Sequence, residues 1–333
     1  ARTGTGKTIA FLLPVIETLL RAATDDDEKT PQEDSFGAII LSPTRELASQ
    51  IHDAANALLT HHPTLTCQVM YGGTDRRRDV ARLQNSSTPP PSILVATPGR
   101  LLDHIDNTIL RRRRVVRRRG GEKRRSVPFS SLLSRTRVLV LDETDRLLDM
   151  GFRDDITSIL KHMPDKNARQ NLLFSATLPP SLRHFLPLTL SPSFHAVDCV
   201  SDVDPATHVN SQVIQRRIVL PEMKHCLSAL VRVVQVFKDE KVMVFFPTAM
   251  LVRYYARLLQ EVLPSIPHVV EMHARLSQEE RTRTCRAFRE MEGAGVMLTS
   301  DVSARGVDYP DVTCVIQYGM PTSREVYIHR LGR

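Results

Sequence analysis

The sequence contains no tryptophan, and aromatic residues make up only 5% of its 333 residues. Its five cysteines are scattered and form no Cys-x-x-Cys pair, so the sequence indicates neither a disulfide framework nor a zinc site. No apolar run approaches the roughly 18–20 residues that cross a bilayer, and we expect no membrane association. Apolar residues nevertheless make up 41% of the chain, which is enough for two ordinary hydrophobic cores.

The net charge of +8 comes from one short tract. Ten basic residues and one acidic residue lie within Arg111–Arg125, so the rest of the chain has a net charge of −1. The overall charge therefore says little about the folded core. The surrounding segment, Leu110–Pro128, is too polar to bury and is expected to be a surface loop.

Short β-rich runs alternate with longer helical segments, a pattern typical of parallel sheets in α/β proteins. The strands expected in the first half are Ala38–Leu41, Thr66–Tyr71, Ile93–Ala96, Val138–Leu141 and Asn171–Phe174. Those expected in the second half are Gln215–Leu220, Val242–Phe246, His268–Met272, Val296–Thr299 and Thr313–Tyr318. The main helices expected between them are Glu46–Leu59, Asp145–Leu160, Met250–Leu263 and Gln278–Glu290.

Two such series predict two domains, which span residues 1–199 and 213–333. Between them, residues 200–212 are polar, contain proline and show no periodicity, as is typical of a linker. We therefore expect two α/β units, each a mostly parallel sheet flanked by helices.

The first eight residues, A-R-T-G-T-G-K-T, have the spacing of a phosphate-binding loop that opens into a helix. Backbone N–H groups of such a loop surround phosphate oxygens, and Gly4 and Gly6 allow the close approach. Lys7 is then expected to reach the outer phosphates, and Thr8 to bind Mg²⁺. A chance turn rich in glycine and threonine is the alternative for this motif alone.

Residues 138–145, V-L-V-L-D-E-T-D, combine the pattern of a buried strand with carboxylates at its end. Asp142 and Glu143 would follow the carboxyl end of a parallel strand, where open α/β sheets bind ligands. Asp142 is a candidate Mg²⁺ ligand, and Glu143 a candidate base that orients and deprotonates a water molecule. An acidic helix cap is the alternative, and Asp145 could have that role as well.

Two further motifs indicate a catalytic function only when they are taken together with the motifs above. Ser175-Ala176-Thr177 follows an expected strand and alone would indicate a turn. Arg330 and Arg333 lie in H-R-L-G-R, and arginines that face a phosphate stabilise the charge that develops during phosphoryl transfer. In isolation, two helical arginines more often form a solvated face.

Together these motifs resemble those of the DEAD-box RNA helicases over nearly the whole chain. Their order is A-R-T-G-T-G-K-T (1–8), P-T-R-E-L-A (43–48), G-G (72–73), T-P-G-R (97–100), D-E-T-D (142–145), S-A-T (175–177), F-F-P-T (245–248), Q-E-E-R (278–281), T-S-D-V-S-A-R-G-V-D (299–308) and H-R-L-G-R (329–333). The resemblance implies two RecA-like lobes that bind ATP, Mg²⁺ and RNA across a cleft. It also implies a monomeric enzyme that couples ATP hydrolysis to local strand separation.

The resemblance further implies a role for each matching residue. The expected nucleotide contacts are Thr3, Gly4, Thr5, Gly6, Lys7, Thr8, Asp142, Glu143, Gly306, Asp308 and Arg333. The expected RNA-backbone contacts are Pro43, Thr44, Arg45, Gly73, Thr97, Gly99, Arg100, Arg281 and Ser300. The residues expected to couple hydrolysis to lobe closure are Asp145, Ser175, Thr177 and His329, and the catalytic set is Lys7, Asp142, Glu143, Arg330 and Arg333. Small residues, backbone amides and arginines suit phosphates and sugars, so we expect little sequence specificity.

The sequence departs from the family pattern at two positions and at both ends. Thr144 replaces the alanine of D-E-A-D, and its hydroxyl needs a partner if it is buried. Ala274 replaces the glycine that usually follows the histidine at position 273, where a positive φ would be strained. The adenine-reading glutamine motif and the last arginine of H-R-x-G-R-x-x-R are absent. We therefore expect this chain alone to be a poor ATPase and its parent to be active.

Several alternatives stay open at this point. The tract Arg111–Arg125 is either an extra, salt-sensitive anchor for RNA phosphates or a surface insertion, and the lack of interleaved aromatic residues favours the insertion. The chain could also be an ATP-gated RNA clamp or a DNA translocase rather than a helicase. Residues 300–312 and 327–333 look most like the fungal mitochondrial intron-splicing helicases, which favours the mitochondrial matrix over the nucleus or cytoplasm.

Overall fold

In the computed structural model, the structure describes residues 6–24, 35–84, 91–114, 123–198, 213–264, 268–301, 309 and 311–331. These residues form two compact units, which divide between Val197 and Asp198. Each unit is a parallel sheet with helices on both faces, which confirms the predicted fold class. The expected linker, residues 200–212, lies outside the described residues.

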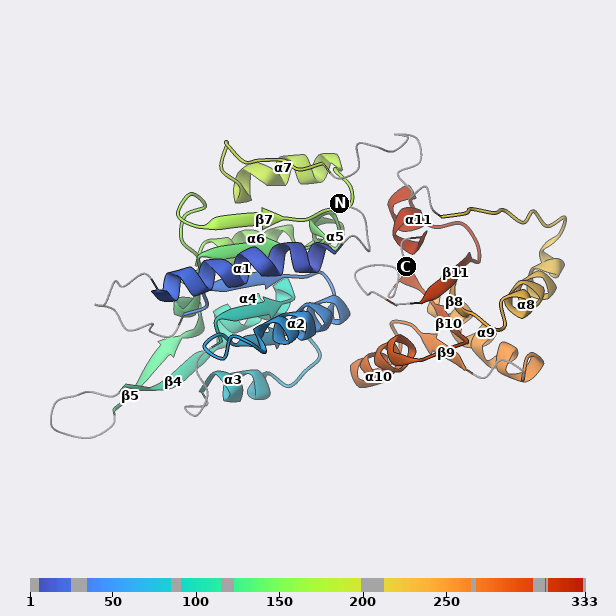
Figure 1. The fold of residues 1–333 in the computed structure, drawn as a ribbon, viewed down its shortest axis with the longest axis horizontal. Helices are drawn as coiled ribbons and strands as arrows, with labels where there is room; N and C mark the ends of the chain where they lie inside the picture. Colours follow the sequence, from blue (N-terminus) through green and yellow to red (C-terminus); the bar gives the residue numbers. More distant parts are fainter. Residues whose placement is uncertain are drawn as a thin grey trace. The chain divides into compact units, whose positions relative to one another are not determined.

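The N-terminal unit is built on five parallel strands in the order β2-β3-β1-β6-β7 (Figure 1). Their bounds are β1 Ala38–Leu41, β2 Cys67–Met70, β3 Ile93–Ala96, β6 Val138–Leu141 and β7 Gln170–Leu173. Every residue of β1, β3 and β6 is buried, because helices cover both faces of the sheet. These strands therefore read as continuous apolar runs in the sequence.

Alternate residues of these strands pack against different helices. Ala38 and Ile40 share one hydrophobic cluster with helices α1 (Lys7–Thr24) and α2 (Arg45–Leu59). Ile39 and Leu41 belong to the cluster on the other face of the sheet. The helices on that face are α3 (Arg76–Gln84), α4 (Pro98–Asn107), α5 (Thr144–Asp149), α6 (Arg153–Leu160) and α7 (Pro180–Thr189).

The C-terminal unit has a parallel sheet in the order β11-β8-β10-β9. Its strands are β8 Lys241–Phe245, β9 Val269–Met272, β10 Gly295–Thr299 and β11 Val312–Gln317. Val242 and Val244 pack with the helices of one face, and Met243 and Phe245 pack with those of the other. The first face carries α8 (Cys226–Val236) and α9 (Ala249–Val262), the second carries α10 (Gln278–Glu290), and α11 (Arg324–Leu331) lies against β11.

The segment Gln215–Leu220 differs from its prediction as a strand. It has no regular secondary structure, and none of the described strands pairs with it. Ile214 and Ile218 are consequently exposed, at 81% and 62%. An apolar alternating pattern alone does not make a strand, because the ladder hydrogen bonds need a neighbouring strand.

Two other segments also differ from their predictions. The expected helix Asp145–Leu160 is divided into α5 and α6, since Gly151 has a φ of +82° and ends the first helix. The segment Leu110–Pro128, expected to be a loop, contains an antiparallel hairpin of β4 (Ile109–Arg114) and β5 (Lys123–Pro128). The second difference changes how the basic tract is interpreted below.

Parallel pairing brings the carboxyl ends of the strands to one edge of the sheet. In the N-terminal unit this edge collects the residues that follow each strand. They are Ser42 after β1, Tyr71 after β2, Thr97 after β3, Asp142 after β6 and Phe174 after β7. Motifs that lie far apart in the sequence therefore meet at this edge.

A buried polar network fixes α3 and α4 beside this edge. Asp79 Oδ2 accepts hydrogen bonds from Arg100 Nη2 at 2.8 Å and Nε at 3.1 Å, and it lies 3.2 Å from His104 Nε2. Arg100 Nη2 also donates to the Thr74 carbonyl at 3.0 Å. The side chains of Asp79 and Arg100 are only 6% and 9% exposed. The ion pair thus gives each of these two buried charges a partner of opposite sign.

We predict that Asp79→Asn lowers the free energy of unfolding by about 3–5 kcal/mol, because it leaves the buried Arg100 guanidinium without its counter-charge. Urea unfolding checks this. Glu17→Gln is the matched control, since Glu17 and Arg21 form a well-exposed pair on α1, and its removal should cost less than about 1 kcal/mol. Equal losses in the two variants would contradict the prediction.

Candidate functional site

The described part of the phosphate-binding loop is its junction with α1. Gly6 has a φ of +76°, a left-handed conformation that glycine adopts without strain, and Lys7 begins the helix. The first N–H groups of a helix have no partner within it, so this end suits an anion. Thr8 lies in this first turn. Thr3, Gly4 and Thr5 are outside the described residues.

Lys7 and Asp142 bring opposite charges together near the end of β6. The Lys7 Nζ atom is buried and has no hydrogen-bond partner among the described residues. Asp142 is 3% exposed, and burial raises the pKa of its carboxyl, an effect opposed by the Lys7 charge and by the Glu143 N–H. A buried ammonium without a hydrogen-bond partner is costly. The geometry therefore suits an anion such as a phosphate at Lys7.

Glu143 forms a strained turn directly after β6. Its φ of 46° and ψ of 54° are left-handed, and its side chain is buried. The turn is held on both sides, since the Glu143 N–H donates to Asp142 Oδ1 at 2.9 Å and the Thr144 N–H donates to the Phe174 carbonyl at 2.9 Å. Such a conformation costs about 1 kcal/mol or more in a residue other than glycine and clusters at functional sites.

The buried Thr144 hydroxyl has two partners. Its Oγ1 donates to the carbonyl oxygens of Leu141, at 3.0 Å, and Phe174, at 3.1 Å. Each carbonyl also accepts a backbone N–H, because Phe174 donates to Leu141 and Thr144 donates to Phe174. The hydroxyl thus adds a link between the ends of β6 and β7, but neither carbonyl depends on it alone.

Asp145 connects the D-E-T-D turn to the S-A-T motif. Its Oδ2 accepts hydrogen bonds from Thr177 Oγ1 at 2.7 Å and from the Thr177 N–H at 3.2 Å. The Ser175 hydroxyl donates to the Thr177 carbonyl at 2.7 Å. Three of the four residues expected to couple hydrolysis to movement are therefore in one network, and the fourth, His329, belongs to the C-terminal unit.

Several expected RNA contacts lie along the carboxyl edge of the N-terminal sheet. Thr44, between Pro43 and Arg45, caps α2 and accepts the Leu47 N–H at 3.3 Å. Gly73 follows β2 with a φ of +84°, and its backbone lies so close to the Arg45 guanidinium that a Cβ atom there would collide with it. The positive φ favours glycine at this position, whereas the guanidinium at the end of the flexible Arg45 side chain can move aside.

The motif T-P-G-R is divided between two environments. Thr97 and Gly99 lie at the start of α4, at the same edge, and the Thr97 N–H donates to the Met70 carbonyl at 3.1 Å. Arg100, predicted to contact RNA, holds α3 against α4 through Asp79 and Thr74. These contacts support this edge of the unit, and the expected RNA contact of Arg100 stays a prediction.

In the C-terminal unit, two expected RNA contacts lie near the carboxyl ends of strands. Ser300 follows β10, and its N–H donates to the Met272 carbonyl at 3.3 Å. Arg281 lies in the first turn of α10, whose start is fixed by a capping box of Ser277 and Glu280. Gly306, Asp308 and Arg333 lie outside the described residues, so their expected roles stay predictions.

Arg330, expected to be catalytic, makes close contacts within the C-terminal unit. Its side chain is 1% exposed, with Nε at 2.8 Å and Nη2 at 2.7 Å from Asp301 Oδ1. Its guanidinium also lies over the Phe245 ring, 5.3 Å from the centroid. These contacts tie α11 to the end of β10, and the expected catalytic role of Arg330 stays a prediction. His329 beside it is fully buried.

Sequence reasoning missed two polar residues that the structure places at the carboxyl edges. Asp79 belongs to no motif, and only the fold brings it to Arg100 and His104. His273 follows β9 and is 3% exposed, with Glu271 Oε2 3.6 Å from its Nε2. The signal for His273 was its place directly after a strand, next to the unusual Ala274.

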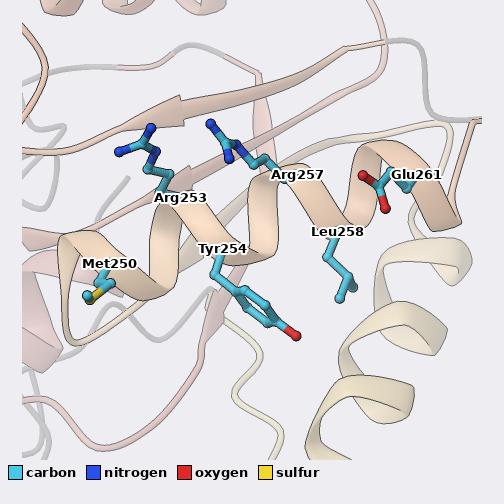
Figure 2. Close-up of a pocket in the computed structure, with 6 residues that line it drawn as sticks. All are labelled: Met250, Arg253, Tyr254, Arg257, Leu258 and Glu261. Atoms are coloured by element: carbon cyan, nitrogen blue, oxygen red, sulfur yellow. The ribbon is translucent and has the colours of Figure 1, made fainter.

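A surface pocket with a volume of about 380 Å³ lies on α9. Figure 2 shows Arg253 and Arg257 on one side of the helix and Tyr254 and Leu258 on the other. All six residues that line it belong to this one helix. It has none of the phosphate-binding features found at Lys7, so we do not assign it to the nucleotide site.

Comparisons with known proteins decide the family. A family model described as DEAD/DEAH box helicase matches residues 1–185, and one described as Helicase conserved C-terminal domain matches residues 225–333. The chain belongs to the DEAD/DEAH box helicase family. The first match covers more than half of the chain and confirms the resemblance that the ordered motifs predicted.

Similar curated proteins are plant DEAD-box ATP-dependent RNA helicases. Helicase 26 of Oryza sativa subsp. japonica is 42% identical over 336 residues, which are 100% of this chain and 56% of that protein. Helicase 31 of Arabidopsis thaliana is 44% identical over 337 residues, which are 100% of this chain and 43% of that protein. The chain thus spans about half the length of these helicases.

Solved structures with a similar fold come from the same family. The DEAD-box helicase Mss116 bound to ssRNA and UDP-BeF has a TM-score of 0.81 and is 26% identical, covering 100% of this chain and 62% of that one. S. cerevisiae Dbp5 bound to RNA and ADP BeF3 has a TM-score of 0.71 and is 25% identical, covering 100% of this chain and 74% of that one. These likenesses agree with the RecA-like assignment of both units.

We predict that Thr144→Ala lowers the free energy of unfolding by about 1 kcal/mol, the usual net contribution of one hydrogen bond. In a protein that carries this chain with its natural flanking sequence, we predict that the variant changes the RNA-stimulated ATPase rate only modestly. Both carbonyls keep a backbone donor, so no buried group is left without a partner. Urea unfolding and a steady-state ATPase assay measure the two effects. Thr144→Ser, which keeps the hydroxyl, is the control. An ATPase loss well beyond about tenfold at unchanged stability would contradict the prediction.

Proposed function

We propose that this chain is the ATPase core of an ATP-dependent RNA helicase or RNP remodeller, which couples ATP hydrolysis to local strand separation. The observation that carries the proposal is the buried group of Lys7, Asp142 and Glu143 at the carboxyl edge of the N-terminal sheet. This group offers a cation for phosphates and two carboxylates for a metal and a water molecule. The family assignment and the names of the plant relatives support it.

The residues present fit an ATP–Mg²⁺ complex. Asp142 and Thr8 would hold Mg²⁺, which usually takes one or two carboxylates with waters and phosphate oxygens. The described residues accordingly contain no cluster of three or more acidic, histidine or cysteine side chains that could form a complete metal cage. The bound ion would neutralise charge on the phosphates. Lys7 would bind the outer phosphates, and the left-handed turn would aim Glu143 at the attacking water.

The coupling step is proposed to run through Asp145 and Thr177. Movement of the D-E-T-D turn on phosphate release would pull on the two hydrogen bonds from Thr177 to Asp145. The S-A-T segment would then shift with the turn, since Ser175 is tied to Thr177. His329 would receive this change in the C-terminal unit, and Arg333 would stabilise the transferred phosphoryl group.

RNA contacts are proposed for Pro43, Thr44, Arg45, Gly73, Thr97, Gly99, Arg100, Arg281 and Ser300, with no preference for base sequence. The structures of Mss116 and Dbp5 with RNA support this choice of ligand. None of the helices in the described ranges has the length and apolar character to span a bilayer. We further propose that the protein acts as a monomer and works in the mitochondrial matrix, as the resemblance to intron-splicing helicases suggests.

Glu143→Gln tests the proposal in a protein that carries this chain with its natural flanking sequence. We predict that hydrolysis falls by about 10²–10⁴-fold, the usual contribution of a general base, while ATP-dependent binding of RNA persists. Single-turnover ATPase and RNA-binding assays measure the two effects. Glu290→Gln, on α10 in the C-terminal unit, is the matched control.

Two outcomes would redirect the proposal. An unchanged hydrolysis rate in Glu143→Gln would favour an ATP-gated RNA clamp with little turnover. Equal stimulation of the unmodified ATPase by DNA and RNA would favour a DNA translocase.

A further inference from the structure

The proposed function leaves the basic tract unused, and part of this tract has a regular backbone. β4 and β5 pair in antiparallel register from Ile109 opposite Pro128 to Arg114 opposite Lys123. Figure 1 shows this hairpin extending beyond the sheet and helices of the N-terminal unit. Paired strands are not what an unstructured surface insertion would give.

The base of the hairpin is fixed in the hydrophobic core. Leu110 and Phe129 are fully buried and belong to the cluster under α4. The Phe129 N–H donates to the Thr108 carbonyl at 3.0 Å, and the Phe129 ring lies 5.8 Å from that of Phe36 and 5.1 Å from that of His104. The hairpin therefore starts from a rigid base and projects as a defined arm.

Positive charge is concentrated in the paired part of this arm. The register places Arg112 opposite Arg125, Arg113 opposite Arg124 and Arg114 opposite Lys123. Residues directly opposite each other have their Cβ atoms about 4.5–5.5 Å apart, and like charges in such pairs destabilise a sheet. Neither strand contains an acidic residue. Successive residues alternate between the faces of a strand, so both faces of the arm carry basic positions.

The arm lies at the end of the sheet opposite the nucleotide and RNA edge. α4 starts directly after the carboxyl end of β3, runs back along the sheet for ten residues, or about 15 Å, and leads into β4. The hairpin base also packs on Phe36, which precedes β1 at its amino end, through a hydrogen bond from the Phe36 N–H to the Leu132 carbonyl at 2.9 Å. An RNA bound at the carboxyl edge would contact the arm only through nucleotides beyond the stretch held at that edge.

The geometry points to a second RNA-binding site on this hairpin. Its ligand is the sugar-phosphate backbone of an RNA segment outside the stretch held at the carboxyl edges. Regularly spaced phosphates would supply negative charge to three successive pairs of basic residues, and release of counterions would drive the binding. Arginine and lysine aimed at phosphates carry no base specificity, so the arm would tether any long RNA. The choice of RNA as the polyanion rests on the proposed function.

The test neutralises the arm in the 333-residue chain, with Arg112, Arg113, Arg124 and Arg125 all changed to Gln. RNA binding is titrated without nucleotide over a range of salt concentrations, with a short oligonucleotide and with a long single strand. Each phosphate contact contributes about 0.7 to the slope of log K against log salt for single strands. We expect the slope for the long RNA to fall by about 3 and the slope for the short RNA to stay unchanged.

Two matched variants separate this site from general charge effects. Replacement of the same four arginines by lysine keeps the charge and should keep the slope. Replacement of four exposed arginines of the C-terminal unit, Arg216, Arg217, Arg253 and Arg257, by glutamine removes the same charge elsewhere and should leave most of the slope. Circular dichroism confirms that each variant is folded.

Three results would overturn the inference. They are an unchanged slope in the hairpin variant, equal losses in the hairpin and control variants, or a hairpin variant that loses binding to polyglutamate but not to RNA. The last result would assign the arm to an acidic protein. Because nucleotide is absent, the outcome does not depend on hydrolysis, and failure of the proposed function would show only in the ATPase assays.

Discussion

A lysine ammonium and a carboxylate are buried together at one end of the N-terminal sheet, and the ligand-binding character of that end depends on this pair. Lys7 lies where a left-handed glycine starts α1, and Asp142 lies where β6 ends. Both positions are fixed by elements whose apolar residues fill the two faces of the sheet. The buried Nζ has no hydrogen-bond partner among the described residues, and burial raises the pKa of the carboxyl. Burial of these charged groups therefore costs free energy when no ligand is bound. This end of the unit is suited to bind phosphate with a divalent cation.

The neighbouring turn extends this arrangement from binding to coupling. Glu143 is held in a left-handed conformation between the hydrogen bond to Asp142 Oδ1 and that from Thr144 to Phe174. Asp145 then receives both donors of Thr177. A change at the phosphates can thus reach the end of β7 through one short chain of contacts. The basic hairpin stands at the opposite end of the sheet and has a different purpose, the capture of further RNA.

The sequence predicted most of the fold, because continuous apolar strands and ordered motifs are local signals. β1, β3 and β10 were predicted within one residue of their bounds. The errors arose where a pattern needs a distant partner. Gln215–Leu220 has strand composition but no neighbouring strand in the described part of the chain. The sequence likewise could not show that Asp79 and Asp301 engage the guanidinium groups of Arg100 and Arg330, because the fold brings these residues together. The basic tract showed only its charge, whereas its pairing register depends on a buried base at Leu110 and Phe129.

The account is tested most directly by the stability of the N-terminal unit with and without ATP and Mg²⁺. In the unmodified chain, nucleotide at about 100 times its Kd should stabilise this unit by about 2.7 kcal/mol. Lys7→Met removes the ammonium that would contact the phosphates, so we predict that ATP and Mg²⁺ no longer stabilise this unit. The gain is measured against the same variant without nucleotide, because the substitution also leaves Asp142 without its counter-charge. An undiminished gain on adding ATP to Lys7→Met would contradict the claim that phosphate is the missing partner of Lys7.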